Sequence, residues 1–154
     1  MKGKSAPQDK GGASQVYRLK VTLVGIKPPI WRRILVPGGT TLEGLHYAIQ
    51  AAMGWTNSHL HQFELGETTY SDRRFELGDV EDERKARLGA IGLKKGKAFR
   101  YIYDFGDNWE HQVKVEDVLA PDEKLRYPTC VDGKRAGPPE DCGGIWGYDE
   151  LLRV

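Results

Sequence analysis

Three histidines of this sequence have side chains and spacings suited to binding a metal ion. His59 and His61 are two residues apart, so on a strand both side chains point to the same face. His111 lies on a second apolar pattern, between Trp109 and Val113. Imidazole is the commonest metal ligand, so three imidazoles on neighbouring strands would form a zinc site.

Carboxylates flank a turn at Gly106. Asp104, Asp107 and Glu110 could complete a site for zinc or a harder ion, with Glu110 or Glu140 as the general base of a hydrolase. The alternative is that the histidines are half buried and hydrogen-bonded, while the aspartates form turns with their own backbone. This alternative is favoured because no ligand spacing here is diagnostic, so the sequence predicts neither a metal nor a cofactor.

A second group of polar side chains lies in residues 135–144, with the sequence RAGPPEDCGG. Prolines stiffen this loop, and rigid loops with exposed polar tips often carry function. A covering loop whose two carboxylates cap backbone amides is an equal alternative. Together these observations predict one candidate polar cluster: His59, His61, Asp104, Asp107, Glu110, His111, Glu140, Asp141 and Cys142.

The elements that position these residues follow from hydrophobic periodicity. Alternation predicts strands over residues 16–23, 30–36, 60–65, 68–70, 98–105 and 109–118, the last two joined in a hairpin. Residues 71–85 and 121–144 are expected to be mostly loop, with a short helical turn at 88–93 and a short C-terminal helix at 148–152. The predicted fold class is α+β: a mixed, mostly antiparallel sheet with one main helix packed on one face.

The main helix is predicted over residues 41–53. Thr40 and Glu43 have the spacing of a capping box, and an apolar stripe from Leu42 to Met53 should lie on the sheet. His46 falls at the margin of this stripe, where we expect it to cover the core edge without a functional role.

Length and composition predict one domain. The chain has 154 residues, of which 39% are hydrophobic, enough for one core and not for two. Residues 1–15 have little apolar content and predict a flexible tail, which leaves 16–154 as the domain. No apolar run approaches the roughly 18 residues of a membrane span, and no signal peptide follows Met1, so we expect a cytoplasmic protein without membrane contact.

Charge argues against one class of partner. The chain has 23 Lys+Arg against 22 Asp+Glu, and the tail holds three lysines and one aspartate, which leaves 20 against 21 in the domain. A net charge of −1 disfavours nucleic acid as a partner, because phosphate binding needs a basic face. Cys130 and Cys142 are expected to be free thiols in a reducing cytosol.

Four motifs follow one another in an order that resembles a known family. They are PPIWRR (28–33), MGW (53–55) followed by HLHQF (59–63), YDFGDNWEH (103–111) and PPEDCGG (138–144). In this order they resemble the Ri-plasmid ORF-three-like family, from about Val16 to the end of the chain. The resemblance implies an α+β fold with a mixed sheet, found in prokaryotes on plasmids and insertion elements.

The chain departs from the family pattern at two places. Many members have a cysteine just before the Pro-Pro pair, where this chain has Gly137, so a thiolate site on that pattern would lack one ligand. Members usually continue into an acidic, aromatic segment, whereas this sequence stops at Val154. We therefore expect a shortened chain and the loss of part of a shared surface.

These observations favour a non-catalytic binding or accessory module associated with plasmids or mobile elements, with an unidentified protein or small molecule as its partner. The alternative is a metal-dependent hydrolase that uses His59, His61, His111 and a carboxylate of the hairpin turn. It requires that turn, the histidine strand and the Pro-Pro loop to meet in one cleft. A nucleic-acid-binding regulator is a further alternative, supported by the mobile-element context and opposed by the charge.

Overall fold

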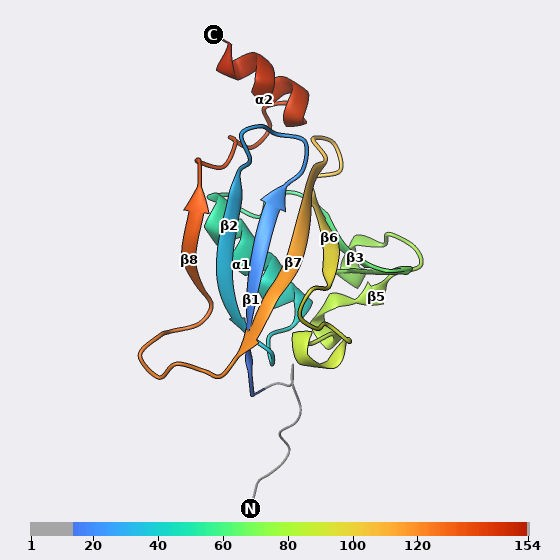
Figure 1. Ribbon diagram of the computed structural model, residues 1–154. Helices are drawn as coiled ribbons and strands as arrows, with labels where there is room; N and C mark the ends of the chain where they lie inside the picture. The colour runs from blue at the N-terminus through green and yellow to red at the C-terminus, as the bar shows by residue number, and fades with distance from the viewer. Residues whose placement is uncertain (1–13, 154) are drawn as a thin grey trace, which may run out of the picture.

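The computed structural model describes residues 14–153. One sheet of eight strands, in the order β5-β4-β3-β6-β7-β1-β2-β8, is covered on one face by helix α1, Leu42–Met53 (Figure 1). Neighbouring strands are antiparallel except for the short parallel pair β4–β5. The predicted α+β fold class is therefore confirmed.

The strands are β1 (Val16–Leu23), β2 (Trp31–Pro37), β3 (His61–Leu65), β4 (Thr68–Ser71), β5 (Glu81–Asp82), β6 (Ala98–Tyr103), β7 (Trp109–Leu119) and β8 (Thr129–Lys134). Of the predicted tail, residues 1–13 lie outside the described residues. Gln15 is described, and its carbonyl accepts the Gly38 N–H at 2.7 Å.

The core lies between α1 and the centre of the sheet. Alternation along β1 turns Tyr17, Leu19, Val21 and Leu23 toward the helix, and all four are buried. The helix buries its own apolar stripe against them. Among residues 14–153 no helix has the length and apolar character needed to cross a bilayer.

Helix α1 begins one residue later than the predicted capping box requires. The Thr41 hydroxyl, not that of Thr40, accepts the Gly44 N–H at 3.1 Å. Glu43 is therefore the second helical residue and not the third, so it is not placed to complete a capping box. Its carboxylate lies instead beside those of Asp72 and Glu83.

The charged segment 71–85 is more structured than predicted. It contains β5 and two short 3₁₀ helices, Arg73–Phe75 and Glu83–Lys85. Asp72 and Asp82 cap these turns by accepting the N–H groups of Arg74 and Arg84. The charged side chains of this segment thus stabilise its short helical turns. Three residues of the segment are buried: Ser71, Asp72 and Glu83.

Three further boundaries differ from the prediction. Strand β8 lies in a region that was expected to be loop. Its residues give no alternating apolar pattern, because most of them are exposed and the strand pairs with β2 through the backbone. Strand β6 ends at Tyr103 because Asp104 adopts a positive φ of 66°. Helix α2 (Gly144–Leu152) begins four residues early and lies beyond the ends of the strands, next to the β1–β2 connection (Figure 1).

Candidate functional site

Three loops meet where β6 ends, at a place that we call the loop junction (His59, Asp104 and Asp141). The antiparallel pairing of β3 with β6 continues one step beyond the strands, where the Asp104 N–H donates to the Leu60 carbonyl at 2.7 Å. His59 therefore reaches the β6–β7 turn. Its Nε2 lies 3.6 Å from Oδ2 of Asp104 and 2.9 Å from Oδ1 of Asp141. An imidazole and two carboxylates from separate parts of the chain thus share one point.

The turn after β6 holds the Asp104 side chain in one orientation. Oδ1 of Asp104 accepts the N–H groups of Gly106 at 3.0 Å and Asp107 at 3.2 Å, while Oδ2 faces His59. Oδ2 of Asp107 accepts the Gly143 N–H at 3.2 Å. The same turn therefore orients one carboxylate and anchors the loop before α2.

The loop before α2 is held from its other side by Trp55 and Glu140. Nε1 of Trp55 donates to the Pro138 carbonyl at 2.8 Å, and the indole ring stacks on Tyr103. Glu140 accepts the Thr56 N–H at 2.7 Å, the Thr56 hydroxyl at 2.8 Å and the Tyr103 hydroxyl. The Glu140 carboxylate is thus used to hold this loop in place.

Three titratable groups near the junction have shifted pKa values. Burial, followed by the hydrogen bond to Glu140, raises the pKa of Tyr103 well above its usual value. Burial alone would raise the pKa of Glu140, but hydrogen bonds from Tyr103 and Thr56 outweigh it and lower this pKa. Burial, and then the charge of Asp107, raises the pKa of the Cys142 thiol. All three shifts move away from neutrality, so these groups are poorly suited to proton exchange at neutral pH.

Gly144 allows the loop to approach the β6–β7 turn, and we predict that alanine there disrupts the junction. A Cβ atom at this position would collide with the carbonyl oxygen of Asp107, and the backbone has a φ of +69°. Backbone strain and displacement of the loop act together, so Gly144→Ala should lower the free energy of unfolding by about 2–4 kcal/mol. Chemical denaturation measures this loss.

Gly66→Ala is the matched control for Gly144→Ala. Gly66 also has a positive φ, of +59°, but a Cβ atom there meets nothing within 4 Å in the described part of the chain. This variant should lose only about 1 kcal/mol, from the backbone conformation alone. Equal losses in the two variants would contradict a close contact at Gly144.

A second polar group, which we call the acidic cavity (Glu43, Asp72 and Glu83), lies between α1 and the segment 71–85. The cavity has a volume of about 360 Å³, and one carboxylate oxygen of each residue lies within 4.8 Å of the other two. Glu83 is 1% exposed, and its Oε1 lies 2.7 Å from Nε2 of His61. Asp72 is paired with the Arg74 guanidinium, whose hydrogen bonds lower the pKa of that carboxyl to about 2.

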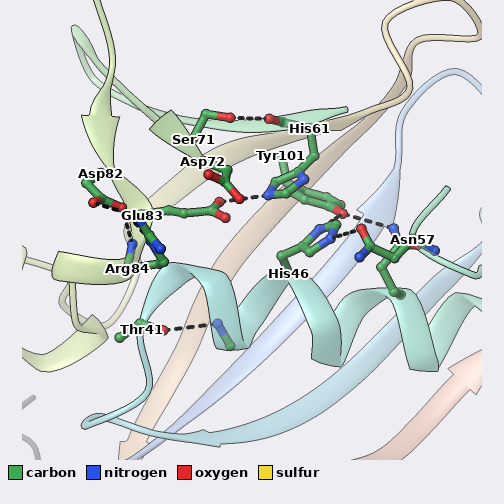
Figure 2. A network of polar contacts seen from close by, with 12 residues as sticks. Thr41, His46, Asn57, His61, Ser71, Asp72, Asp82, Glu83, Arg84 and Tyr101 are labelled. Atoms are coloured by element: carbon green, nitrogen blue, oxygen red, sulfur yellow. Dashed lines mark hydrogen bonds and ion pairs between the residues drawn. The ribbon is translucent and has the colours of Figure 1, made fainter. Parts of the chain in front are cut away.

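Beside the acidic cavity a series of hydrogen bonds surrounds His46 (Figure 2). The His46 ring stacks on His61 with centroids 3.5 Å apart, its Nδ1 lies 2.6 Å from the Tyr101 hydroxyl, and its Nε2 lies 2.6 Å from Oδ1 of Asn57. Burial, and then the charge of His61, lowers the pKa of His46 to about 3, so this imidazole is neutral. Because Oδ1 of Asn57 can only accept, Nε2 donates to it and the Tyr101 hydroxyl donates to Nδ1. Gln50 donates in turn to that hydroxyl at 3.0 Å.

The structure distributes the predicted polar cluster over four places. Six members lie in or beside the loop junction: His59, Asp104, Asp107, Glu140, Asp141 and Cys142. His61 lies at the acidic cavity. His111 is buried in the core with Nδ1 3.1 Å from the Tyr101 carbonyl oxygen, and burial lowers its pKa to about 4. Glu110 pairs with Arg100 on the open face of the sheet.

The three histidines therefore do not share a site. Among residues 14–153, two groups of three possible metal ligands have donor atoms within 4.8 Å of one another, and neither contains His61 or His111. The hairpin turn, the segment before β3 and the Pro-Pro loop do meet, as the hydrolase hypothesis requires, but His59 is the only one of its three histidines at their meeting point.

Sequence reasoning missed the acidic cavity. It placed His46 at the margin of the helix stripe, one turn after Leu42, and the structure buries this side chain among the core-facing residues of α1. Nothing in the charged run 81–85 distinguishes Glu83 from its neighbours. Its burial follows only from the position of His61 on β3.

A family model described as plasmid pRiA4b ORF-3-like protein matches residues 15–154. The chain belongs to this family. Uncharacterized protein y4hQ of Sinorhizobium fredii (strain NBRC 101917 / NGR234) is 41% identical over 143 residues, 92% of this chain and 73% of that protein. The crystal structure of the protein of unknown function MM3350 from Methanosarcina mazei Go1 is similar with a TM-score of 0.85 and 42% identity, over 94% of this chain and 83% of that chain.

The resemblance predicted from four motifs is therefore confirmed, and the structure links three of them physically. In this plasmid pRiA4b ORF-3-like chain, the second, third and fourth motifs supply His59, Asp104 and Asp141 to the loop junction. At Gly137, where the resemblance led us to expect a cysteine, a Cβ atom would collide with the Met53 carbonyl oxygen. The loop geometry of this chain thus requires glycine there.

Proposed function

We propose that this protein is a non-catalytic binding module and that its small-molecule or protein partner presents a cationic group to the acidic cavity. The observation that carries the proposal is the convergence of Glu43, Asp72 and Glu83 in one cavity. Carboxylates so close together repel one another, and a bound ammonium or guanidinium group would offset that repulsion. The cavity is therefore suited to an organic cation or a basic side chain.

Arg74 supports this choice of ligand. Its guanidinium is bound to Asp72 although 68% of the side chain is exposed, and the charge of Glu43 adds to that of Asp72 in raising the pKa of Arg74. The cavity thus already attracts a cation from its own chain. Tyr47 and Phe75 also line it, and aromatic rings favour cations through their quadrupole.

The groups beside the cavity favour binding over acid–base catalysis. The pKa of His46 is about 3, and burial raises the pKa of Tyr101 well above its usual value, so neither exchanges a proton at neutral pH. We rank the metal-dependent hydrolase second, because its three histidines have different partners.

We further propose a cytoplasmic role accessory to plasmids or mobile elements, in keeping with the name of the family.

Isothermal titration of the full chain with spermidine and with arginine methyl ester tests the proposed cavity. Glu43→Gln should weaken the binding of either cation by about five- to ten-fold, because it removes one partly exposed charge of the cavity. Glu64→Gln makes the same change on the open face of the sheet and should leave both affinities unchanged. Absence of binding by both cations, or equal affinity in the two variants, would contradict the proposal.

A further inference from the structure

We infer that the loop junction is a centre for a divalent transition-metal ion, with His59, Asp104 and Asp141 as its protein ligands. His59 also lines the acidic cavity, but Asp104 and Asp141 do not. The inference uses none of the three carboxylates of the cavity, so it does not rest on the proposed function. One donor atom of each residue lies within 4.8 Å of the other two. The two carboxylates carry a charge of −2, which a divalent ion would neutralise.

The spacing of the donor atoms fits an ion of this kind. Ligand atoms around one tetrahedral ion, at bond lengths of about 2.0–2.1 Å, lie about 3.4 Å apart. The distances from Nε2 of His59 to Oδ1 of Asp141 and Oδ2 of Asp104, 2.9 Å and 3.6 Å, bracket this value. The two carboxylate oxygens lie within 4.8 Å of each other, and the exposed Asp141 side chain can close the remaining gap around an ion.

One buried polar atom at the junction has no hydrogen-bond partner among residues 14–153. Nε2 of His59 is buried and has no hydrogen bond with any residue that the structure describes, although two carboxylates face it. Asp104 is 6% exposed, and its Oδ2 is directed at this same point. Buried polar atoms normally have a partner, and a metal ion would supply one to Nε2 of His59.

The surroundings of Asp104 resemble the outer shell of a metal ligand. Its Oδ1 accepts two backbone N–H groups, from Gly106 and Asp107, which hold the carboxylate in one orientation. Asp141 stands on the opposite side and its side chain is 69% exposed. The proposed ion would therefore keep positions open toward solvent, where water or a further ligand can bind.

The ligand types select the class of ion. Imidazole suits Zn²⁺ and the later transition metals, whereas carboxylates also suit Mn²⁺. Ca²⁺ and Mg²⁺ prefer oxygen ligands throughout, and two protein carboxylate oxygens supply less than either needs. We therefore expect Zn²⁺ and Mn²⁺ to bind more tightly than Ca²⁺ or Mg²⁺.

Titration of the full chain with Mn²⁺ tests the inference, because Mn²⁺ has little affinity for the two thiols and its paramagnetism locates it. We expect one ion per chain, with the amide signals of residues 104–108 and 141–143 broadened first. Asp141→Asn should weaken Mn²⁺ binding more than about ten-fold, and His59→Gln should do the same. Asp141 is largely exposed, so its variant is expected to fold normally, which circular dichroism checks.

Glu43→Gln distinguishes the loop junction from the acidic cavity. Unchanged Mn²⁺ affinity in this variant supports the junction, whereas a loss there, with broadening around residues 72 and 83, would assign the ion to the cavity and overturn the inference. Unchanged Mn²⁺ affinity in Asp141→Asn would overturn it as well. The inference would also be overturned if Ca²⁺ bound as tightly as Mn²⁺ and its affinity did not change in His59→Gln.

Discussion

Acidification from about pH 7 to about pH 5 is expected to lower the free energy of unfolding by roughly 4 kcal/mol. Burial lowers the pKa values of His46 and His111 from 6.5 to about 3 and about 4. In the unfolded chain both imidazoles take up a proton near their ordinary pKa, so the unfolded state binds more protons over this interval. The two neutral imidazoles make their full contribution to the free energy of unfolding at pH values above their pKa in the unfolded chain. This contribution decreases as the pH falls toward their pKa values in the folded protein. Urea denaturation at a series of pH values measures the slope.

His46→Gln separates the histidine effect from that of other groups. Glutamine has no proton to gain, so the slope over this interval should fall to about half, whatever the stability of the variant at neutral pH. Glu116, whose pKa is lowered by its hydrogen bond from Arg33, loses its contribution mainly below this interval, because its ordinary pKa is 4.5. A stability that does not change over this interval would contradict neutral, buried imidazoles.

Glu83→Ala is expected to destabilise the fold by about 3–5 kcal/mol, because it removes one member of a buried pair. Glu83 is 1% exposed and His61 3% exposed, and the contact between Oε1 and Nε2 is 2.7 Å. Nδ1 of His61 has no hydrogen bond within residues 14–153, so alanine would leave both ring nitrogens without a partner. The loss is a large part of the roughly 5–15 kcal/mol that stabilises a typical domain. Chemical denaturation at neutral pH measures it.

Two further variants isolate the buried pair. Glu83→Gln keeps an oxygen that accepts from His61 and should cost less than alanine, about 1–2 kcal/mol. Arg84→Ala changes the next residue, whose side chain is 44% exposed, and should cost less than about 0.5 kcal/mol. A loss in Glu83→Ala no greater than that in Arg84→Ala would show that the pair does not stabilise the fold.

Most of the secondary structure could be predicted because its signals are local. The alternation along β1 and β7 and the helical stripe of α1 depend on residues two to four positions apart, and each buries the face that the pattern indicates. Strand β8 has no such signal, since it pairs through its backbone at the sheet edge. The N-cap was displaced by one residue because neighbouring threonines, Thr40 and Thr41, are both able to cap.

The residues of the candidate sites could be predicted from the sequence only in part. The family motifs identify the segments that form the loop junction. The expected strand positions of the histidines, however, wrongly grouped His61 and His111 with His59. His59 precedes β3, so the strand alternation that would align it with His61 does not apply. His111 turns into the core, where the Tyr101 carbonyl is its partner.

The sequence by itself determined the fold class, the family, the main elements and most of the residues of the loop junction. Only the tertiary structure decided which of these residues meet. The pairing of β3 with β6 sets His59 beside Asp104, and the close approach at Gly144 helps to bring the loop of Asp141 to both. Only the tertiary structure also decided that Glu83, in a run of charged residues, is buried against His61. The physical reason is that burial and partnership depend on segments distant along the chain, whereas a pattern in the sequence records only neighbours.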